Sequence, residues 1–194
     1  MLFNKNILKS AGLTLIELLV ALSIVAILAA VALPSFQYVI QSVQVGSAVN
    51  SFLADIRFAR SEAIRRGGSV VLCRSDDPQA AAPVCSDAAA AAGWASGWIV
   101  FQELGLMAAG GDKDPEDPLL RVQAPLTAIG AIASSQQAVS KFRFTATGRL
   151  LNDSMGPDSS LTFGSTDYAA TVQRVVCVGL GGRARVAGDG TKSC

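Results

Sequence analysis

The hydrophobic pattern of the chain begins with a long uninterrupted apolar stretch. From Leu13 to Leu33 the chain reads LTLIELLVALSIVAILAAVAL, and nearly every position is apolar. As a helix this stretch is about 30 Å long, which is the thickness of the hydrocarbon core of a bilayer. Lys5 and Lys9 precede it without an acidic neighbour. The pattern therefore predicts a transmembrane segment over 13–33 with a cytoplasmic N-terminus.

Past Pro34 the pattern changes to apolar residues that recur along one helical face. Gly67-Gly68 then ends the helix. We therefore expect one helix from about residue 13 to residue 66, whose continuation over 34–67 packs on a folded domain. The residues of this predicted stripe are Phe36, Val39, Ile40, Val43, Phe52, Ile56, Ala59 and Ala63.

After Gly68 the pattern switches to short alternating runs bounded by turn residues, which is typical of strands. Short connections favour antiparallel pairing packed on the helix, so the predicted fold class is α+β, with a β-rich domain over 68–194. Trp94 and Trp98 are interpreted as core residues of this domain. The predicted strands lie at 69–74, 97–101, 119–123, 141–145, 148–151, 160–163, 173–179 and 183–187.

Composition removes several function classes. The chain has no histidine, so it lacks the usual general base, the commonest metal ligand and any Ser-His or Cys-His nucleophile pair. No nucleophile motif or phosphate-cradling loop stands out. The acidic run at 112–118 lacks the spacing of an EF-hand and is interpreted as a solvated loop. We expect neither enzymatic activity nor a bound cofactor or metal.

The four cysteines indicate disulfides. They show no C-x-x-C spacing, which disfavours zinc, and an even number beyond an apolar segment is typical of an oxidising compartment. Four cysteines allow three pairings. We predict the local one, Cys73–Cys85 with Cys177–Cys194.

Glu17 is unusual because it places a carboxylate inside the apolar segment. A charge near the membrane interior is costly unless it is paired, so Glu17 marks a functional site by default. A secretory signal is the alternative interpretation, since Ala30-Val31-Ala32 resembles a small-residue cleavage site. The length of the apolar stretch and its carboxylate argue against that alternative.

The residues from Gly12 to Glu17 (GLTLIE), which follow a short basic leader at 1–12, resemble the prepilin peptidase site of type IV pilins and type II secretion pseudopilins. The resemblance implies cleavage after Gly12 and N-methylation of Leu13. It also implies that Glu17 pairs with the terminal ammonium of a neighbouring subunit during assembly. Pro34 lies where that family has a helix-kinking proline.

Three further stretches together resemble the GspH/FimT family of minor pilins and minor pseudopilins. They are FARSEAI at 58–64, VLC at 71–73 and GWIVF at 97–101. The resemblance implies a type IV pilin-like fold, with the long helix against antiparallel β-sheets. It also implies a single-pass inner-membrane protein with a periplasmic domain, which later joins other pilin subunits in a pilus on the cell surface.

The sequence GRAR at 182–185 is the candidate binding motif. In a strand, Arg183 and Arg185 would face the same side, where two guanidinium groups can meet neighbouring phosphates. Two arginines on an exposed edge can also serve only to keep that edge soluble and unpaired. The sequence resembles the DNA-binding motif of FimT minor pilins, which implies DNA contacts by Arg183 and Arg185. Gly182 would shape the turn, and Lys192 would add charge.

Two functions follow from these resemblances. The first is a FimT-like minor type IV pilin that is processed by prepilin peptidase, assembles into the pilus and binds extracellular double-stranded DNA non-specifically for uptake in natural transformation. The alternative is a GspH-like minor pseudopilin of a type II secretion system that does not bind DNA.

Overall fold

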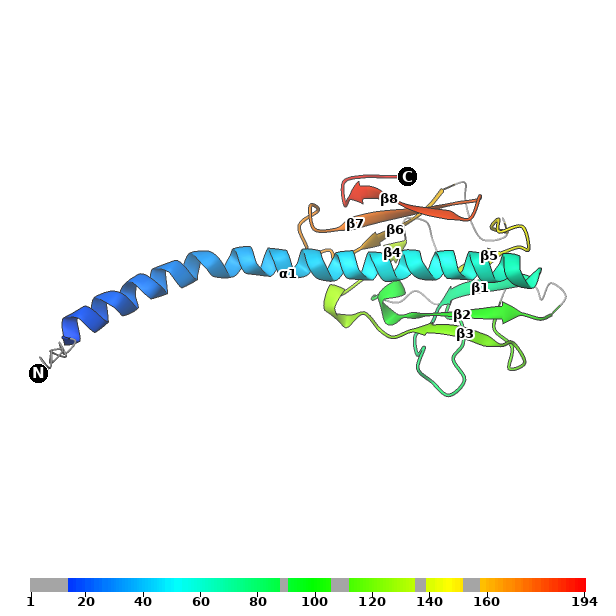
Figure 1. Cartoon of the computed structure of the whole chain (residues 1–194), viewed down its shortest axis with the longest axis horizontal. Helices are drawn as coiled ribbons and strands as arrows, with labels where there is room; N and C mark the ends of the chain where they lie inside the picture. Colours follow the sequence, from blue (N-terminus) through cyan, green and yellow to red (C-terminus); the bar gives the residue numbers. More distant parts are fainter. Residues whose placement is uncertain (1–13, 88–90, 106–111, 135–138, 152–157) are drawn as a thin grey trace, which may run out of the picture. The chain divides into compact units, whose positions relative to one another are not determined.

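The long N-terminal helix of the prediction is present. The computed structural model describes residues 14–87, 91–105, 112–134, 139–151 and 158–194, and its helix α1 spans Leu15–Arg66, 52 residues (Figure 1). At its start, Oγ1 of Thr14 accepts a hydrogen bond from the backbone N–H of Glu17 at 3.3 Å. This is one half of a capping box, and the carboxylate of Glu17 also lies favourably in the first turn.

The helix ends where the glycine pair predicted its end. Gly67 has a φ of 63°, in the left-handed region, and its N–H donates to the carbonyl of Ile64. The N–H of Gly68 donates to the carbonyl of Ala63. Together these bonds form a Schellman motif, which satisfies carbonyls that the helix leaves without partners.

The chain divides into two compact units, Met1–Val39 and Ile40–Cys194. In the first unit the large apolar side chains of the described helix are exposed, as at Leu15, Leu22 and Ile27. Within the described ranges, no helix combines the length and the apolarity needed to cross a membrane.

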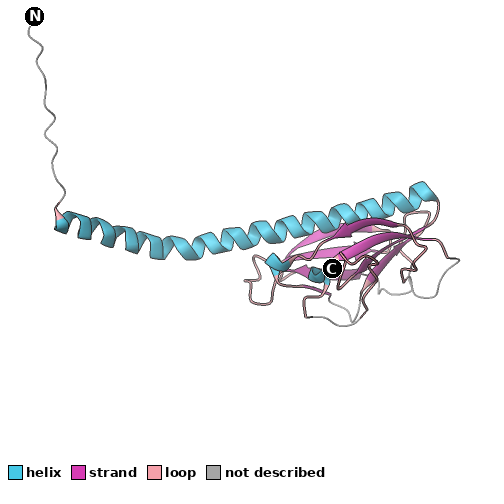
Figure 2. Cartoon of the chain, turned by 90° about the horizontal axis from the view of Figure 1, so that it is seen from below, coloured by secondary structure: helices cyan, strands magenta, loops and turns pink. Residues whose placement is uncertain are grey.

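The second unit contains two antiparallel four-stranded sheets. They lie on one side of the helix (Figure 2). The first sheet has the order β3-β2-β1-β5, built from β3 (Leu119–Gln123), β2 (Trp98–Glu103), β1 (Ser69–Arg74) and β5 (Lys141–Phe144). The second has the order β4-β6-β7-β8, built from β4 (Ile132–Ser134), β6 (Asp158–Phe163), β7 (Arg174–Gly179) and β8 (Arg183–Asp189). Two short 3-10 helices, η1 (Trp94–Ser96) and η2 (Thr127–Ile129), lie between strands.

One predicted strand is wrong and one observed strand was not predicted. The segment 148–151 does not form a strand: Gly148, with a φ of 73°, closes a turn in which its N–H donates to the carbonyl of Thr145, and Leu150 forms only an isolated antiparallel bridge with Phe144. Beyond the turn, the N–H of Leu150 donates to Leu180 at 3.0 Å, so this segment links the chain to the β7–β8 connection. β4 has only three residues, too few to produce a visible alternation.

The core lies where the second part of α1 meets both sheets. Phe52 is fully buried at its centre, with ring centroids 5.5 Å from Trp98 of β2 and 5.5 Å from Phe163 of β6. Trp94 of η1 and Phe142 of β5 complete the aromatic cluster. Both tryptophans are therefore core residues, as predicted.

The predicted apolar stripe of the helix is half right. Its later members, from Phe52 onward, are buried, but Phe36 and Val43 are 67% and 66% exposed. The sheets cover the helix only from Val45 onward. The buried helical residues that precede Phe52 differ from the predicted ones, because they lie on another face of the helix. The helical core residues are Val45, Ala48, Val49, Phe52, Leu53, Ile56, Ala59 and Ala63.

A buried carboxylate fixes the helix to the first sheet. Asp55 accepts hydrogen bonds from Nε1 of Trp98 at 2.8 Å and from Nη1 of Arg121 at 2.6 Å. The guanidinium of Arg121 also lies 4.3 Å from the ring centroid of Phe58. The buried carboxylate of Asp55 is therefore hydrogen-bonded and ion-paired inside the domain, and these contacts compensate the cost of burying its charge.

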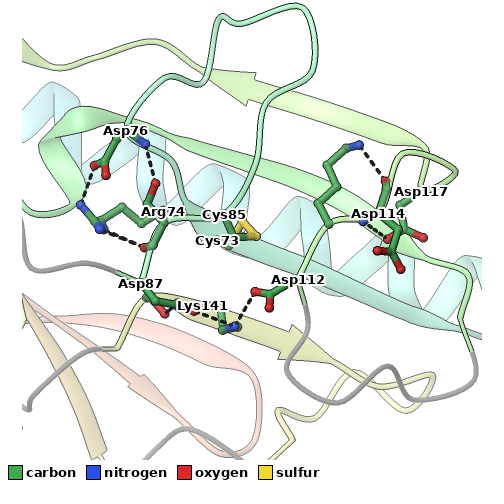
Figure 3. The surroundings of a disulfide bond; sticks show 12 residues. Cys73, Arg74, Asp76, Cys85, Asp87, Asp112, Asp114, Asp117 and Lys141 are labelled. Atoms are coloured by element: carbon green, nitrogen blue, oxygen red, sulfur yellow. Dashed lines mark hydrogen bonds and ion pairs between the residues drawn. A yellow bond between two sulfur atoms is a disulfide. The ribbon is translucent and has the colours of Figure 1, made fainter.

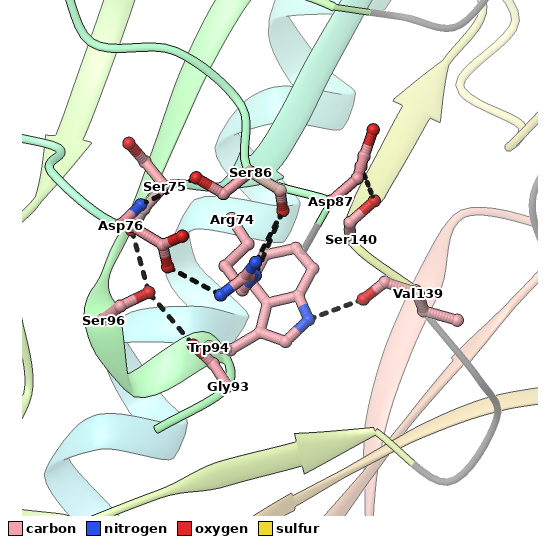
Figure 4. Close-up of polar contacts among 10 residues, drawn as sticks. All are labelled: Arg74, Ser75, Asp76, Ser86, Asp87, Gly93, Trp94, Ser96, Val139 and Ser140. Carbon is pink, nitrogen blue, oxygen red and sulfur yellow. Dashed lines mark hydrogen bonds and ion pairs between the residues drawn. The ribbon is translucent and has the colours of Figure 1, made fainter. Parts of the chain in front are cut away.

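The loop after β1 is fastened across the outer face of the first sheet. Cys73 is bonded to Cys85, which packs against the small outer cluster around Phe101 (Figure 3). Arg74 donates to the carbonyl of Ser86 at 3.1 and 2.9 Å and to Asp76 at 2.7 Å (Figure 4). The loop thus covers apolar side chains that would otherwise face water.

Asp87 ties the same loop to β5. The hydroxyl of Ser140 donates to its carboxylate, and with the ammonium of Lys141 this bond lowers the pKa of Asp87 from its usual value. Lys141 also donates to Asp112 at 2.9 Å (Figure 3). A carboxylate whose folded pKa is lowered stabilises the fold above its unfolded pKa, and this contribution is lost as the pH falls through the folded value.

We expect Phe52→Ala to lower the free energy of unfolding by about 3–5 kcal/mol, because it leaves a cavity among rings that cannot all move inward. Urea unfolding followed by circular dichroism measures this loss. Val43→Ala, on the same helix and 66% exposed, is the control and should change stability by no more than about 0.5 kcal/mol. Similar small losses for both variants would contradict the central place given to Phe52.

Candidate nucleic-acid interface

The two motif arginines lie on β8, the edge strand of the second sheet (Figure 1). In the β7–β8 register Arg183 is opposite Gly179 and Arg185 is opposite Cys177. Both arginines are exposed, whereas Ala184 between them packs against the core. Because side chains alternate along a strand, Arg183 and Arg185 share the outward face, as their spacing predicts.

Gly182 forms the turn that begins β8. Its φ of 72° lies in the left-handed region, and its N–H donates to the carbonyl of Gly179 at 2.8 Å. A Cβ at this position would come within 2.2 Å of the carbonyl oxygen of Gly148. Glycine is therefore required here for both conformation and space. Its role in the site is to set the direction in which Arg183 leaves the turn.

The C-terminus is tied to the middle of β7. Cys177 is bonded to Cys194 with a Cα–Cα distance of 5.6 Å, so both predicted disulfides are present. Since Cys177 is opposite Arg185, this bond lies directly beside the motif. The disulfide therefore holds the final residues of the chain next to the strand that carries the arginines.

Lys192 lies apart from the two arginines. It is next to Gly188 at the far end of β8, and a strand of that length separates this end from Arg183 by roughly 17–20 Å. Asp189 is close by, and its pKa is lowered by hydrogen bonds from Thr191 and then by the charges of Lys192 and Arg174. The charge of Lys192 is therefore partly balanced by Asp189.

The structure brings two arginines of the helix, outside the β8 motif, to the same surface. Arg57 and Arg60 of α1 line a groove of about 520 Å³ together with Gly182 and Arg183. Nη1 of Arg60 donates to the carbonyl of Gly182 at 3.3 Å. The signal for this proximity is the Arg-x-x-Arg spacing, which gives one helical face but does not say what that face meets.

Among the residues that the structure describes, the motif and groove arginines have no acidic partner. In the part of the chain that the structure describes, no carboxylate forms an ion pair with Arg57, Arg60, Arg183 or Arg185. Arg65 and Arg66 differ, because both bind Glu62 and thereby lower the pKa of that carboxyl to about 2. The surface around the β7–β8 turn is therefore positively charged.

The described residues offer no grouping for a metal. Within the described ranges, no set of three or more His, Cys, Asp and Glu side chains converges on a point. In the acidic turn, Asp117 instead accepts hydrogen bonds from the backbone N–H groups of Leu104 and Asp114. These bonds shape the turn at the end of β2.

The N-terminal processing residues lie mostly outside the structure. Gly12 and Leu13 are outside the described residues. Glu17 is exposed in the first turn of α1, and the helix continues through Pro34. The described residues therefore do not test the predicted cleavage, methylation or pairing of Glu17.

Comparison with known families decides the class of protein. A family model described as type II transport protein GspH matches residues 48–182, more than half of the chain. The chain belongs to the GspH family. A second model, the prokaryotic N-terminal methylation motif, matches residues 7–33, which include Gly12, Leu13 and Glu17. The predicted membership of the GspH/FimT family is confirmed.

Solved structures support the fold of this GspH-family chain. The type IV minor pilin FimU of Pseudomonas aeruginosa matches in two crystal forms. One form has 18% sequence identity and a TM-score of 0.53, covering 77% of this chain and 92% of FimU. The other has 20% identity and a TM-score of 0.50, covering 77% of this chain and 96% of FimU. The predicted α+β, type IV pilin-like fold is confirmed.

No curated protein matches the chain significantly. The GspH match itself ends at Gly182 and does not include Arg183 or Arg185. The family match therefore covers the second part of the helix and the strands up to β7, and the role of Arg183 and Arg185 rests on the geometry of β8.

We expect the double variant Cys177→Ser, Cys194→Ser to lose about 3 kcal/mol of stability on the chain-entropy model of disulfides. The β8 amides should also exchange with deuterium faster, because the C-terminal residues no longer hold the strand against β7. Hydrogen–deuterium exchange measures this local effect. The control is the double variant Cys73→Ser, Cys85→Ser, which lacks the other disulfide and should leave the exchange of the β8 amides unchanged. Unchanged β8 exchange in the Cys177→Ser, Cys194→Ser variant would contradict the role given to the Cys177–Cys194 bond.

Proposed function

We propose that this GspH-family protein is a minor type IV pilin that binds extracellular double-stranded DNA for uptake in natural transformation. The observation that carries the proposal is the outward-facing pair Arg183 and Arg185 on an edge strand, without a carboxylate partner among the described residues. Charges left unpaired by the fold are available to a ligand. Phosphate is a ligand that planar guanidinium groups bind through two parallel hydrogen bonds.

Binding would be electrostatic and independent of sequence. Arg183 and Arg185 are two residues apart on a strand, so their Cα atoms are about 7 Å apart. This distance is close to the spacing of successive phosphates along one strand of DNA. The described residues of this surface give no indication that it recognises the edges of the bases, which is what sequence-specific binding would need. We therefore expect contacts to the backbone of the duplex only, with a non-specific dissociation constant of about 10⁻⁴–10⁻⁶ M at physiological salt.

The proposed location follows from the N-terminal match. The methylation motif supports a protein that is anchored in the inner membrane by its N-terminal segment, with the domain in the periplasm, and is then assembled into the pilus at the cell surface. Prepilin peptidase would cleave between Gly12 and Leu13. Other pilin subunits would cover the exposed apolar side chains Phe36, Val39 and Val43, and the amine of a neighbour would neutralise Glu17.

A second candidate function is a minor pseudopilin of a type II secretion system. The description of the matching family as type II transport protein GspH favours it. A pseudopilin of this kind would use the same helix for assembly but would not need the arginines of β8. DNA binding therefore distinguishes the two functions.

We expect the double variant Arg183→Gln, Arg185→Gln to abolish the shift of a short duplex in a native gel while the circular dichroism spectrum stays unchanged. Binding by the unaltered chain should also weaken steeply as salt rises, because counterions released from the phosphates oppose it. The matched control is Arg65→Gln, Arg66→Gln, which removes the same charge at a site where both arginines already bind Glu62. Undiminished binding by the β8 variant would exclude the site, and absence of binding by the unaltered chain would favour the pseudopilin.

We expect the mature protein to begin at N-methylated Leu13, because cleavage after Gly12 leaves the amine that Glu17 of a neighbour needs. Edman sequencing and mass spectrometry of protein from membranes and filaments give this terminus. Glu17→Gln should be cleaved normally but enter filaments poorly, which separates processing from assembly. A mature start at Leu33 would show signal-peptide cleavage instead and would overturn the pilin assignment of the segment.

A further inference from the structure

We propose that the DNA-binding surface extends from β8 across the groove onto α1, and that Arg57 and Arg60 bind the phosphate backbone together with Arg183. This inference rests on the proposed DNA-binding function and names residues that lie more than a hundred positions away from the β8 motif. Its basis is the groove that the helix and the β7–β8 turn form together.

The helical side of the groove is one continuous face. Arg57, Arg60, Ser61 and Ile64 follow the spacing i, i+3, i+4, i+7, which places them above one another on α1. The other wall is Gly182, Arg183 and Ala184. Arg183 therefore belongs both to the outward face of β8 and to the groove, and it connects the two surfaces.

Arg60 is held in place at the base of the groove. It donates to the carbonyl of Gly182 at 3.3 Å, and a Cβ at Gly148 would lie 3.0 Å from its Nε. Two turns that each require glycine thus leave the space that this guanidinium fills. A guanidinium fixed by the backbone loses less freedom when it binds an anion, because its position is already set.

Arg57 is the group that is free to bind. It is exposed, one turn away from Arg60, and within the described residues it has no hydrogen-bond or ion-pair partner. The acidic residues of the same helical stretch are engaged elsewhere, Asp55 with Trp98 and Arg121, and Glu62 with Arg65 and Arg66. No carboxylate of the described residues lines the groove. Its positive potential is therefore not neutralised from within the described domain.

DNA fits this groove better than a second protein. Continuity with Arg183 means that a duplex lying along β8 passes the groove, so its phosphates meet both sets of arginines without a further binding event. The wall is also short of the large apolar anchors that dominate protein–protein contacts, since only Ile64 is large and apolar. The groove thus provides charge and little else, which is what a sequence-independent phosphate contact needs.

The test is fluorescence anisotropy of a labelled duplex with the full chain in a non-ionic detergent, over a series of salt concentrations. We expect Arg57→Gln, Arg60→Gln to weaken binding about tenfold at low salt and to reduce the slope of log K against log salt by about 1–2, since each lost phosphate contact lowers the slope by about 1. Arg57→Lys should bind nearly as well as the unaltered chain because it retains the charge. Arg65→Gln, Arg66→Gln, from the same helix and with the same change in charge, should leave the slope unchanged.

The outcomes separate this inference from the function on which it rests. If the β8 variant Arg183→Gln, Arg185→Gln loses binding but the groove variant behaves like the Arg65/Arg66 control, the motif binds DNA and the groove does not. If the groove variant binds DNA normally but enters filaments poorly, the groove contacts another subunit, and the inference is wrong. If the unaltered chain binds no duplex, both proposals fail. Thermal unfolding monitored by circular dichroism shows whether the variant Arg57→Gln, Arg60→Gln is folded. The variant Arg57→Lys alters the same position without loss of charge, so it separates the effect of charge from that of the altered side chain.

Discussion

The ring of Phe52 packs against aromatic rings from both sheets. This contact positions the second part of α1, and the arrangement of the rest of the domain depends on that position. Trp98 and Phe142 approach it from the first sheet, and Phe163 approaches it from the second. The inner faces of both sheets pack against this helix in one core cluster. A sheet with one apolar face needs such a partner, and here one helix serves both sheets.

The position of the helix also creates the surface proposed to bind DNA. After Phe52, the apolar face of the helix packs against the sheets. Arg57 and Arg60 therefore lie on the face of the helix that is next to the β7–β8 turn. Gly182 and Gly148 allow that approach, because a side chain at either position would collide with the neighbouring segment. The groove is thus a consequence of close packing between the helix and two glycine turns.

The edge strand β8 combines a structural need with a proposed function. An edge exposes unpaired backbone groups to other chains, and charged side chains on it discourage unwanted strand pairing. Arg183 and Arg185 meet that need whether or not they bind DNA, so their presence alone does not distinguish the two readings. The GspH match covers residues 48–182, which include the second part of the helix and the strands up to β7, and it ends before Arg183. The proposed DNA binding therefore has to be argued from the site itself.

Local pattern was sufficient for much of the fold. The helix end at Gly67 and the strands at 69–74 and 119–123 follow from signals that are contained in a few neighbouring residues. The predicted disulfide pairing, the local one of three that four cysteines allow, is also present. Alternation along a strand was likewise enough to place Arg183 and Arg185 on one face. The pattern failed where its signal was short or ambiguous, as for the three-residue strand β4 and for 148–151, where only Leu150 bridges to Phe144.

What the sequence determined by itself is therefore the order of the elements, their periodicity and the family to which the chain belongs. Only the tertiary structure decided which part of the helix is covered, because Phe36 and Phe52 are both apolar but only Phe52 lies under the sheets. It also decided that Arg60 of the helix touches Gly182. The physical reason is that burial and charge proximity depend on segments that are far apart in the sequence, and no local pattern records which of them meet.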